Sequence, residues 1–207
     1  MKKEVSINDK IKLSEHFTLG ELCKTSYITT DGNIPSRKAI ENLRNICENW
    51  LEDLRYSYNT LYGRAGVTRE GQSPCNPVAE LPAHRGDSPC VSLGSGPIVS
   101  SDVPVIINSG FRSEEVNRMC GGAKGSNHLT GCAVDIRCYG PEHMIRMAGI
   151  LLDISDGTKR DFDELILEKR GSTYWIHFAV RPKDNRRKIL FGYSPMGSSM
   201  INRQPAL

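Results

Sequence analysis

The first third of the chain carries apolar residues at helical spacing, and residues 12–60 are predicted to be helical. Thr18-Leu19-Gly20-Glu21 has the form of a capping box, in which a hydroxyl and a carboxylate each satisfy a backbone N–H at a helix start. Pro35 is predicted to open a second helix. Its apolar positions are Ile40, Leu43, Cys47, Trp50 or Leu51, and Leu54. We expect this apolar face to pack on the rest of the domain.

The middle of the chain, residues 62–101, lacks apolar periodicity. Proline and glycine cluster there, as in Gly71-Gln72-Ser73-Pro74 and Gly94-Ser95-Gly96-Pro97. Such a long stretch without regular structure is unusual inside a compact domain, and it is normally either functional or disordered. The composition therefore predicts a flexible insertion, with a functional lid or contact loop as the alternative.

From Val103 onward, short strands and helices are predicted to alternate. Ser113 can cap a short helix that has Glu114 and Glu115 in its first turn, where acidic groups suit the helix dipole. The other predicted elements are strands at Val103–Asn108 and Gly131–Arg137, a helix at Pro141–Leu152, and a β-hairpin of Phe162–Glu168 and Thr173–Val180. Helices followed by a small, mostly antiparallel sheet indicate an α+β fold. We predict that residues 1–207 form a single domain.

The charge balance and the chain's hydropathy exclude some classes of protein. With 27 Lys and Arg against 24 Asp and Glu, the net charge of +3 is too small to indicate nucleic acid as the main partner. No apolar run approaches the ~20 residues that would cross a bilayer, so no membrane insertion is expected. Residues 1–10 lack the apolar stretch of a secretory signal, and we expect synthesis in the cytoplasm.

The cysteines are seven in number, irregularly spaced and without a CxxC pair. In a reducing cytoplasm this usage predicts free thiols. A local bridge between Cys75 and Cys90 is the alternative.

Two histidines and an aspartate are the strongest candidates for chemistry. His128 lies just before a predicted strand, Asp135 lies within it, and His177 lies on the last strand of the hairpin. Strand alternation places Asp135 on the same face as Ala133, and His177 on the same face as Trp175. Two imidazoles and a carboxylate are a typical ligand set for catalytic zinc, which keeps its fourth position for water.

The sequence around these residues resembles a known family. Ser126-x-His128-x-x-Gly131-x-Ala133-x-Asp135, followed by Trp175-x-His177, is similar to the motifs of the zinc D-Ala-D-Ala carboxypeptidases. That family belongs to the LAS metallopeptidases, which include the phage L-alanyl-D-glutamate endopeptidases. The resemblance covers residues 12–60 and 103–181, and its other parts are Phe17–Leu22, the SGYRS-like Asn108–Ser113, Asn117, Gly121-Gly122, and Phe162–Glu168.

The resemblance implies a LAS/hedgehog-like fold and a role for each site residue. His128, Asp135 and His177 would hold Zn2+. Arg112 would bind the developing oxyanion or a substrate carboxylate, and Ser126 would hydrogen-bond the substrate. His16, His84 and His143 are expected to be surface residues.

A carboxylate is also needed to move the proton of the attacking water. Many relatives place this acid three residues before the last histidine, where this chain has Tyr174. Glu168 matches the acid that ends the family's F-D-Q-L-I-x-E strand, and we predict it as the base. Glu164, where the family often has Gln, is the alternative, because tight pairing of the hairpin about Arg170-Gly171 would set it opposite His177.

The implied function is hydrolysis of a peptide bond in the stem peptides of peptidoglycan. The enzyme would be a D-Ala-D-Ala carboxypeptidase or an endopeptidase, acting as a monomer. Lacking a signal sequence, it would resemble a phage lysin that reaches the cell wall by phage-type release. A zinc-holding peptidoglycan-binding module without activity is the alternative. The basic run from Arg181 to Lys188 is predicted to be a solvated tail that could favour an anionic wall.

Overall fold

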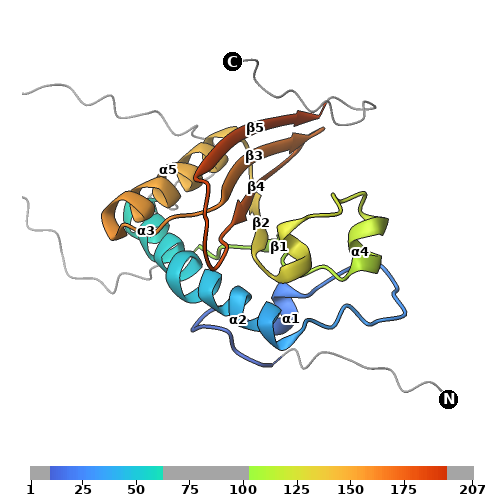
Figure 1. Cartoon of the computed structure of the whole chain (residues 1–207). Coiled ribbons are helices and arrows are strands. Elements are labelled where there is room, and N and C mark those ends of the chain that lie inside the picture. Colours follow the sequence, from blue (N-terminus) through green and yellow to red (C-terminus); the bar gives the residue numbers. More distant parts are fainter. Residues whose placement is uncertain (1–9, 63–102, 195–207) are drawn as a thin grey trace, which may run out of the picture.

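The computed structural model describes residues 10–62 and 103–194 (Figure 1). The predicted insertion and the Cys75–Cys90 bridge lie outside the described residues. Cys23, Cys47, Cys120, Cys132 and Cys138 are free thiols, as predicted. In the described parts of the chain, every helix is too short or too polar to cross a membrane.

The N-terminal helices are capped where the sequence predicts. Helix α1 (Leu19–Leu22) begins after Thr18, whose hydroxyl accepts a hydrogen bond from the Glu21 N–H at 3.3 Å. Helix α2 (Arg37–Ile46) begins after Ser36, which caps it in the same way, and it continues through a π-helical turn into α3. The π-turn η1 covers Cys47–Leu51 and α3 covers Glu52–Tyr62. Residues 24–36 are not helical, so the prediction for 12–60 was too broad.

A five-stranded sheet follows, in the order β1-β2-β4-β3-β5. The strands are β1 (Ile107–Ser109), β2 (Ala133–Cys138), β3 (Glu164–Arg170), β4 (Thr173–Ala179) and β5 (Lys188–Ser194). All neighbours are antiparallel except β3 and β5, which are parallel. The α+β class is therefore confirmed, and the sheet is mixed. Helices α4 (Glu114–Met119) and α5 (Pro141–Thr158) complete the connections, and α5 is longer than predicted.

The two faces of the sheet have different surroundings. On one face, the ring of Trp50 from η1 packs against Phe178 at 5.0 Å and against Phe162 at 6.3 Å between centroids. Figure 1 shows α3 and α5 running along this side of the sheet. The alternate residues, including Asp135 and His177, lie on the other face, because successive side chains of a strand point in opposite directions.

The basic run after β4 is largely exposed, as predicted, but it is not a free tail. Arg186 binds the fully buried carboxylate of Asp163 through Nε at 2.8 Å and Nη2 at 2.7 Å, and Arg181 lies 2.9 Å from the same carboxylate. Burial alone would raise the pKa of Asp163, but these cations and the Asn127 amide lower it to about 2. The ion pairs turn the chain back beside β3, where β5 pairs with it. Arg181 and Arg186 therefore neutralise the charge of the buried Asp163 carboxylate.

One glycine fixes the approach of α2 to the segment that carries His128. That segment is a 3-10 helix, η3 (Asn127–Thr130), and Gly131 ends it in the left-handed conformation with φ of 70°. A Cβ on Gly131 would lie only 2.4 Å from the carbonyl oxygen of Ala39 in α2. The Asn42 amide of α2 donates a hydrogen bond to the Thr130 carbonyl at 2.9 Å beside this contact.

We expect Gly131→Ala to destabilise the fold more than Gly171→Ala. Gly171 also has a positive φ, of 59°, but no atom lies within 4 Å of the position that a methyl group would take there, so the substitution carries only the backbone cost of about 1 kcal/mol. Gly131→Ala adds the clash with Ala39, worth about 2 kcal/mol more. Urea unfolding of both variants measures the difference, and equal losses would contradict the close approach.

Candidate metal centre

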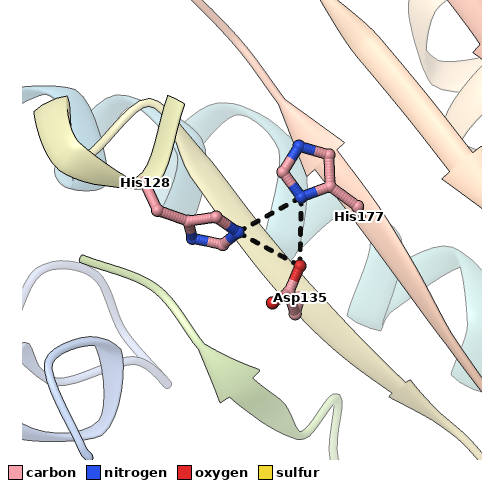
Figure 2. Close-up of side chains that lie close together, drawn as sticks. All are labelled: His128, Asp135 and His177. Carbon is pink, nitrogen blue, oxygen red and sulfur yellow. Dashed lines mark hydrogen bonds and ion pairs between the residues drawn. The ribbon is translucent and has the colours of Figure 1, made fainter. Parts of the chain in front are cut away.

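Three side chains from separate elements meet on the open face of the sheet (Figure 2). His128 comes from η3, Asp135 from β2 and His177 from β4, where Asp135 and His177 are directly paired across the strands. Asp135 Oδ1 lies 3.2 Å from His128 Nε2 and 3.1 Å from His177 Nδ1, and the two nitrogens are 3.2 Å apart. The sequence prediction that these three residues converge is therefore met by the geometry.

The other ring nitrogen of His128 is fixed by the backbone. His128 Nδ1 lies 2.6 Å from the carbonyl oxygen of Gly110, which leaves Nε2 facing the cluster. Gly110 packs so closely on α1 that a Cβ would lie 2.3 Å from the Leu22 carbonyl oxygen. The Phe111 N–H also donates to that oxygen, at 2.8 Å. The glycine of the SGYRS-like segment is thus needed for the position of this carbonyl.

Arg112 holds the second oxygen of the aspartate. Its Nη2 forms an ion pair with Asp135 Oδ2, and its Nε donates to Ser109 Oγ at 2.8 Å. The Arg112 N–H also donates to the His128 carbonyl at 3.1 Å. Arg112, predicted to contact substrate, is therefore first of all a partner of Asp135.

Sequence reasoning missed Asn33, a buried residue that braces this loop. Its side-chain oxygen accepts from the Ser113 N–H at 2.7 Å, and its amide donates to the Cys23 carbonyl at 2.8 Å. Asn33 lies 80 residues before Ser113, and no local pattern marks such a distant contact.

The electrostatics of the cluster suit a cation. Burial disfavours ionised Asp135, but His128, His177 and Arg112 outweigh it and hold the pKa of Asp135 below its usual range. Burial lowers the pKa of His128. Burial also opposes a charge on His177, yet Asp135 and Glu164 raise the pKa of His177 to about 9. Two imidazole nitrogens and one carboxylate oxygen, all within 4.8 Å of one another, could hold a metal ion, and this donor set fits zinc.

The register of the hairpin places the two candidate glutamates on either side of this cluster. The turn lies at Gly171-Ser172, and the residue paired with His177 is Ile166 rather than either glutamate. Glu168 pairs with Trp175, whose indole Nε1 donates to Glu168 Oε2 at 2.5 Å. Glu164 pairs with Ala179, and its Oε2 lies 3.7 Å from His177 Nε2. Both acids share the face of the sheet that carries the cluster.

Four other residues named in the sequence analysis have simple placements. Ser126 caps η3, its hydroxyl accepting from the His128 N–H at 3.3 Å, so it lies beside the cluster. Tyr174 is an odd number of residues from His177 and therefore lies on the opposite face of β4. His143 packs its ring on Tyr58 at 5.1 Å, away from the cluster, and His16 pairs with Glu52 at 2.7 Å.

His128, Asp135 and His177 on this α+β fold thus form a candidate metal site, with two of the three residues buried. Residues 100–158 match the family model described as Peptidase M15. The matched segment contains Arg112, His128 and Asp135, and ends before His177 and Glu168. No curated protein shows significant similarity to the chain. The match confirms the resemblance to the M15 zinc peptidases, the family of the D-Ala-D-Ala carboxypeptidases.

We expect His177→Ala to lower bound zinc well below one ion per chain, because it removes one of the three candidate ligands. His143→Ala is the matched control, since that ring lies outside the cluster, and it is expected to keep the wild-type content. Metal analysis after dialysis measures both. Stoichiometric zinc in His177→Ala would refute its role as a ligand.

Proposed function

We propose that this protein is a zinc-dependent peptidase that hydrolyses a peptide bond in peptidoglycan stem peptides. The observation that carries the proposal is the convergence of His128, Asp135 and His177, with Glu168 on the same face of the sheet. The match to the M15 peptidases supports the reaction class and the kind of substrate.

His128, Asp135 and His177 would hold the zinc ion. When bound there, zinc polarises the scissile carbonyl and lowers the pKa of water toward ~7. The protein directs Nε2 of His128, Nδ1 of His177 and Oδ1 of Asp135 toward one point. The other polar atom of each side chain contacts the Gly110 carbonyl, Glu164 or Arg112, respectively.

Glu168 is the better candidate for the general base. Burial raises the pKa of Glu168, and the nearby charge of Asp135 raises it further, which makes its carboxylate a better proton acceptor. The indole of Trp175 occupies Oε2, so Oε1 is the oxygen that would take the proton of the attacking water and return it to the leaving amine. The neighbouring His177 ring and the charge of Arg186 instead lower the pKa of Glu164.

Arg112 and Ser126 complete the proposed site. Arg112 uses Nε for Ser109 and Nη2 for Asp135, so its Nη1 is the group that would bind the oxyanion or a substrate carboxylate. The Ser126 hydroxyl accepts from the His128 N–H and can still donate its own hydrogen to the substrate. We further propose a lysin-like role, in which a monomer acts on the cell wall after phage-type release.

Digestion of purified peptidoglycan tests the function. The metal-stripped protein is expected to be inactive, and added zinc is expected to restore release of fragments. Mass spectrometry of the new termini then distinguishes a carboxypeptidase, which releases D-Ala, from an endopeptidase. Tightly bound zinc without any cleavage would favour the non-catalytic binding module instead.

Glu168→Gln is expected to keep zinc and to lower turnover by about 10²–10⁴-fold, because the amide cannot accept the proton. The matched variant is Glu164→Gln, at the other end of the same face of β3. If Glu164→Gln loses turnover to this extent while Glu168→Gln does not, the assignment of the base is wrong. Turnover is measured on a stem-peptide substrate, with zinc content determined in parallel.

A further inference from the structure

Glu164 lies in the site but has no part in the proposed chemistry. It is half-buried, with a side-chain exposure of 16%, on the face of β3 that carries the cluster. The ring of His177 turns its Nδ1 toward Asp135 and His128, and turns Nε2 toward Glu164 Oε2 at 3.7 Å. The carboxylate therefore stands at the ring nitrogen that points away from the metal-binding atoms.

We propose that Glu164 is a positioning residue that holds the imidazole of His177 with Nδ1 facing the metal site; this rests on the metal site of the proposed function. An imidazole that binds a metal through one nitrogen keeps hydrogen on the other nitrogen. A carboxylate beside Nε2 favours hydrogen at Nε2 and leaves the Nδ1 lone pair for a metal. Glu164 also opposes rotation of the ring, which would carry Nδ1 away from Asp135.

The carboxylate of Glu164 is itself held from two directions. Its Oε1 accepts from Arg186 Nη2 at 2.9 Å and lies 3.7 Å from Lys188 Nζ. Its Oε2, the oxygen nearest His177, accepts from the Asn127 amide at 3.2 Å. These contacts fix where the carboxylate stands, as an orienting group requires.

Asn127 links this arrangement to the other histidine. It directly precedes His128 in η3, and its amide donates both to Glu164 and to the buried Asp163 at 3.0 Å. The acidic pair at the start of β3 thus contacts His177 and also anchors the turn that carries His128. Replacing Glu164 therefore removes a direct contact with His177, and it acts on His128 only indirectly, through Asn127.

The other two members of the cluster already have an outer partner of this kind. The Gly110 carbonyl contacts Nδ1 of His128, and Arg112 contacts Oδ2 of Asp135. Glu164 supplies the equivalent contact for His177. Outer contacts of this type commonly change metal affinity by about 10–100-fold when they are removed.

The test measures zinc affinity of the full-length protein by competition with a chromophoric chelator, so it does not depend on activity. Glu164→Ala is expected to bind zinc about 10–100-fold more weakly. Glu164→Gln is expected to restore most of the affinity, because its amide oxygen can take the place of Oε2 beside Nε2 of His177. Glu142→Gln, the same change at an exposed glutamate of α5 outside the cluster, is the matched control, and its affinity is expected to equal that of the wild type.

Wild-type affinity in Glu164→Ala, or a loss in Glu164→Gln as large as in Glu164→Ala, would overturn the proposal. If Glu164→Ala does not fold, the imidazole 15N shifts of the zinc-loaded wild type decide instead. Hydrogen on Nε2 of His177, with Nδ1 bound to the metal, supports the proposal, and the reverse overturns it. A wild-type protein that binds no zinc would instead overturn the metal site itself, and a protein that binds zinc without cleaving peptidoglycan would overturn only the peptidase.

Discussion

The structure is organised around one buried carboxylate, that of Asp135. A charge with only 7% of its surface exposed is costly unless donors or cations surround it. Oδ1 is shared by two histidines and Oδ2 is held by Arg112. These partners of Asp135 come from η3, β4 and the loop after β1, so stabilising its charge brings these three segments together. The same demand for positive charge is what makes the point between Asp135 and the two rings suitable for a metal cation.

The two glutamates of β3 lie in different surroundings. Glu164 and Glu168 are four residues apart and share one face of β3, with Ile166 between them opposite His177. At one end, Glu168 meets the indole of Trp175 in surroundings that raise its pKa. At the other, Glu164 meets cations and a ring nitrogen that lower its pKa. Two identical side chains therefore differ in basicity because their neighbours across the sheet differ.

Sequence reasoning was most accurate where contacts are local. The hairpin from Glu164 to Ala179, the Ser113 cap and the free state of the five described cysteines were predicted correctly. It failed for β5, because the cationic residues from Arg181 to Lys188 outweighed the short apolar run that follows them. Two of those cations, Arg181 and Arg186, pair with the buried carboxylate of Asp163, although about half of the Arg186 side chain stays exposed. An acid and its partners about twenty residues apart leave no periodic signal.

The sequence by itself determined the α+β class and the identity of the metal-binding candidates, because both motifs are local. One is the spacing of His128 and Asp135 about a glycine turn, and the other is the spacing of Trp175 and His177 on one strand. Only the tertiary structure decided which side of the cluster each glutamate occupies, which nitrogen of each imidazole faces the metal site, and that Arg112 contacts Asp135. These features depend on strand register and on contacts such as that of Asn33 with Ser113. The physical reason is that burial and pairing, rather than residue type, set the orientation and basicity of each group.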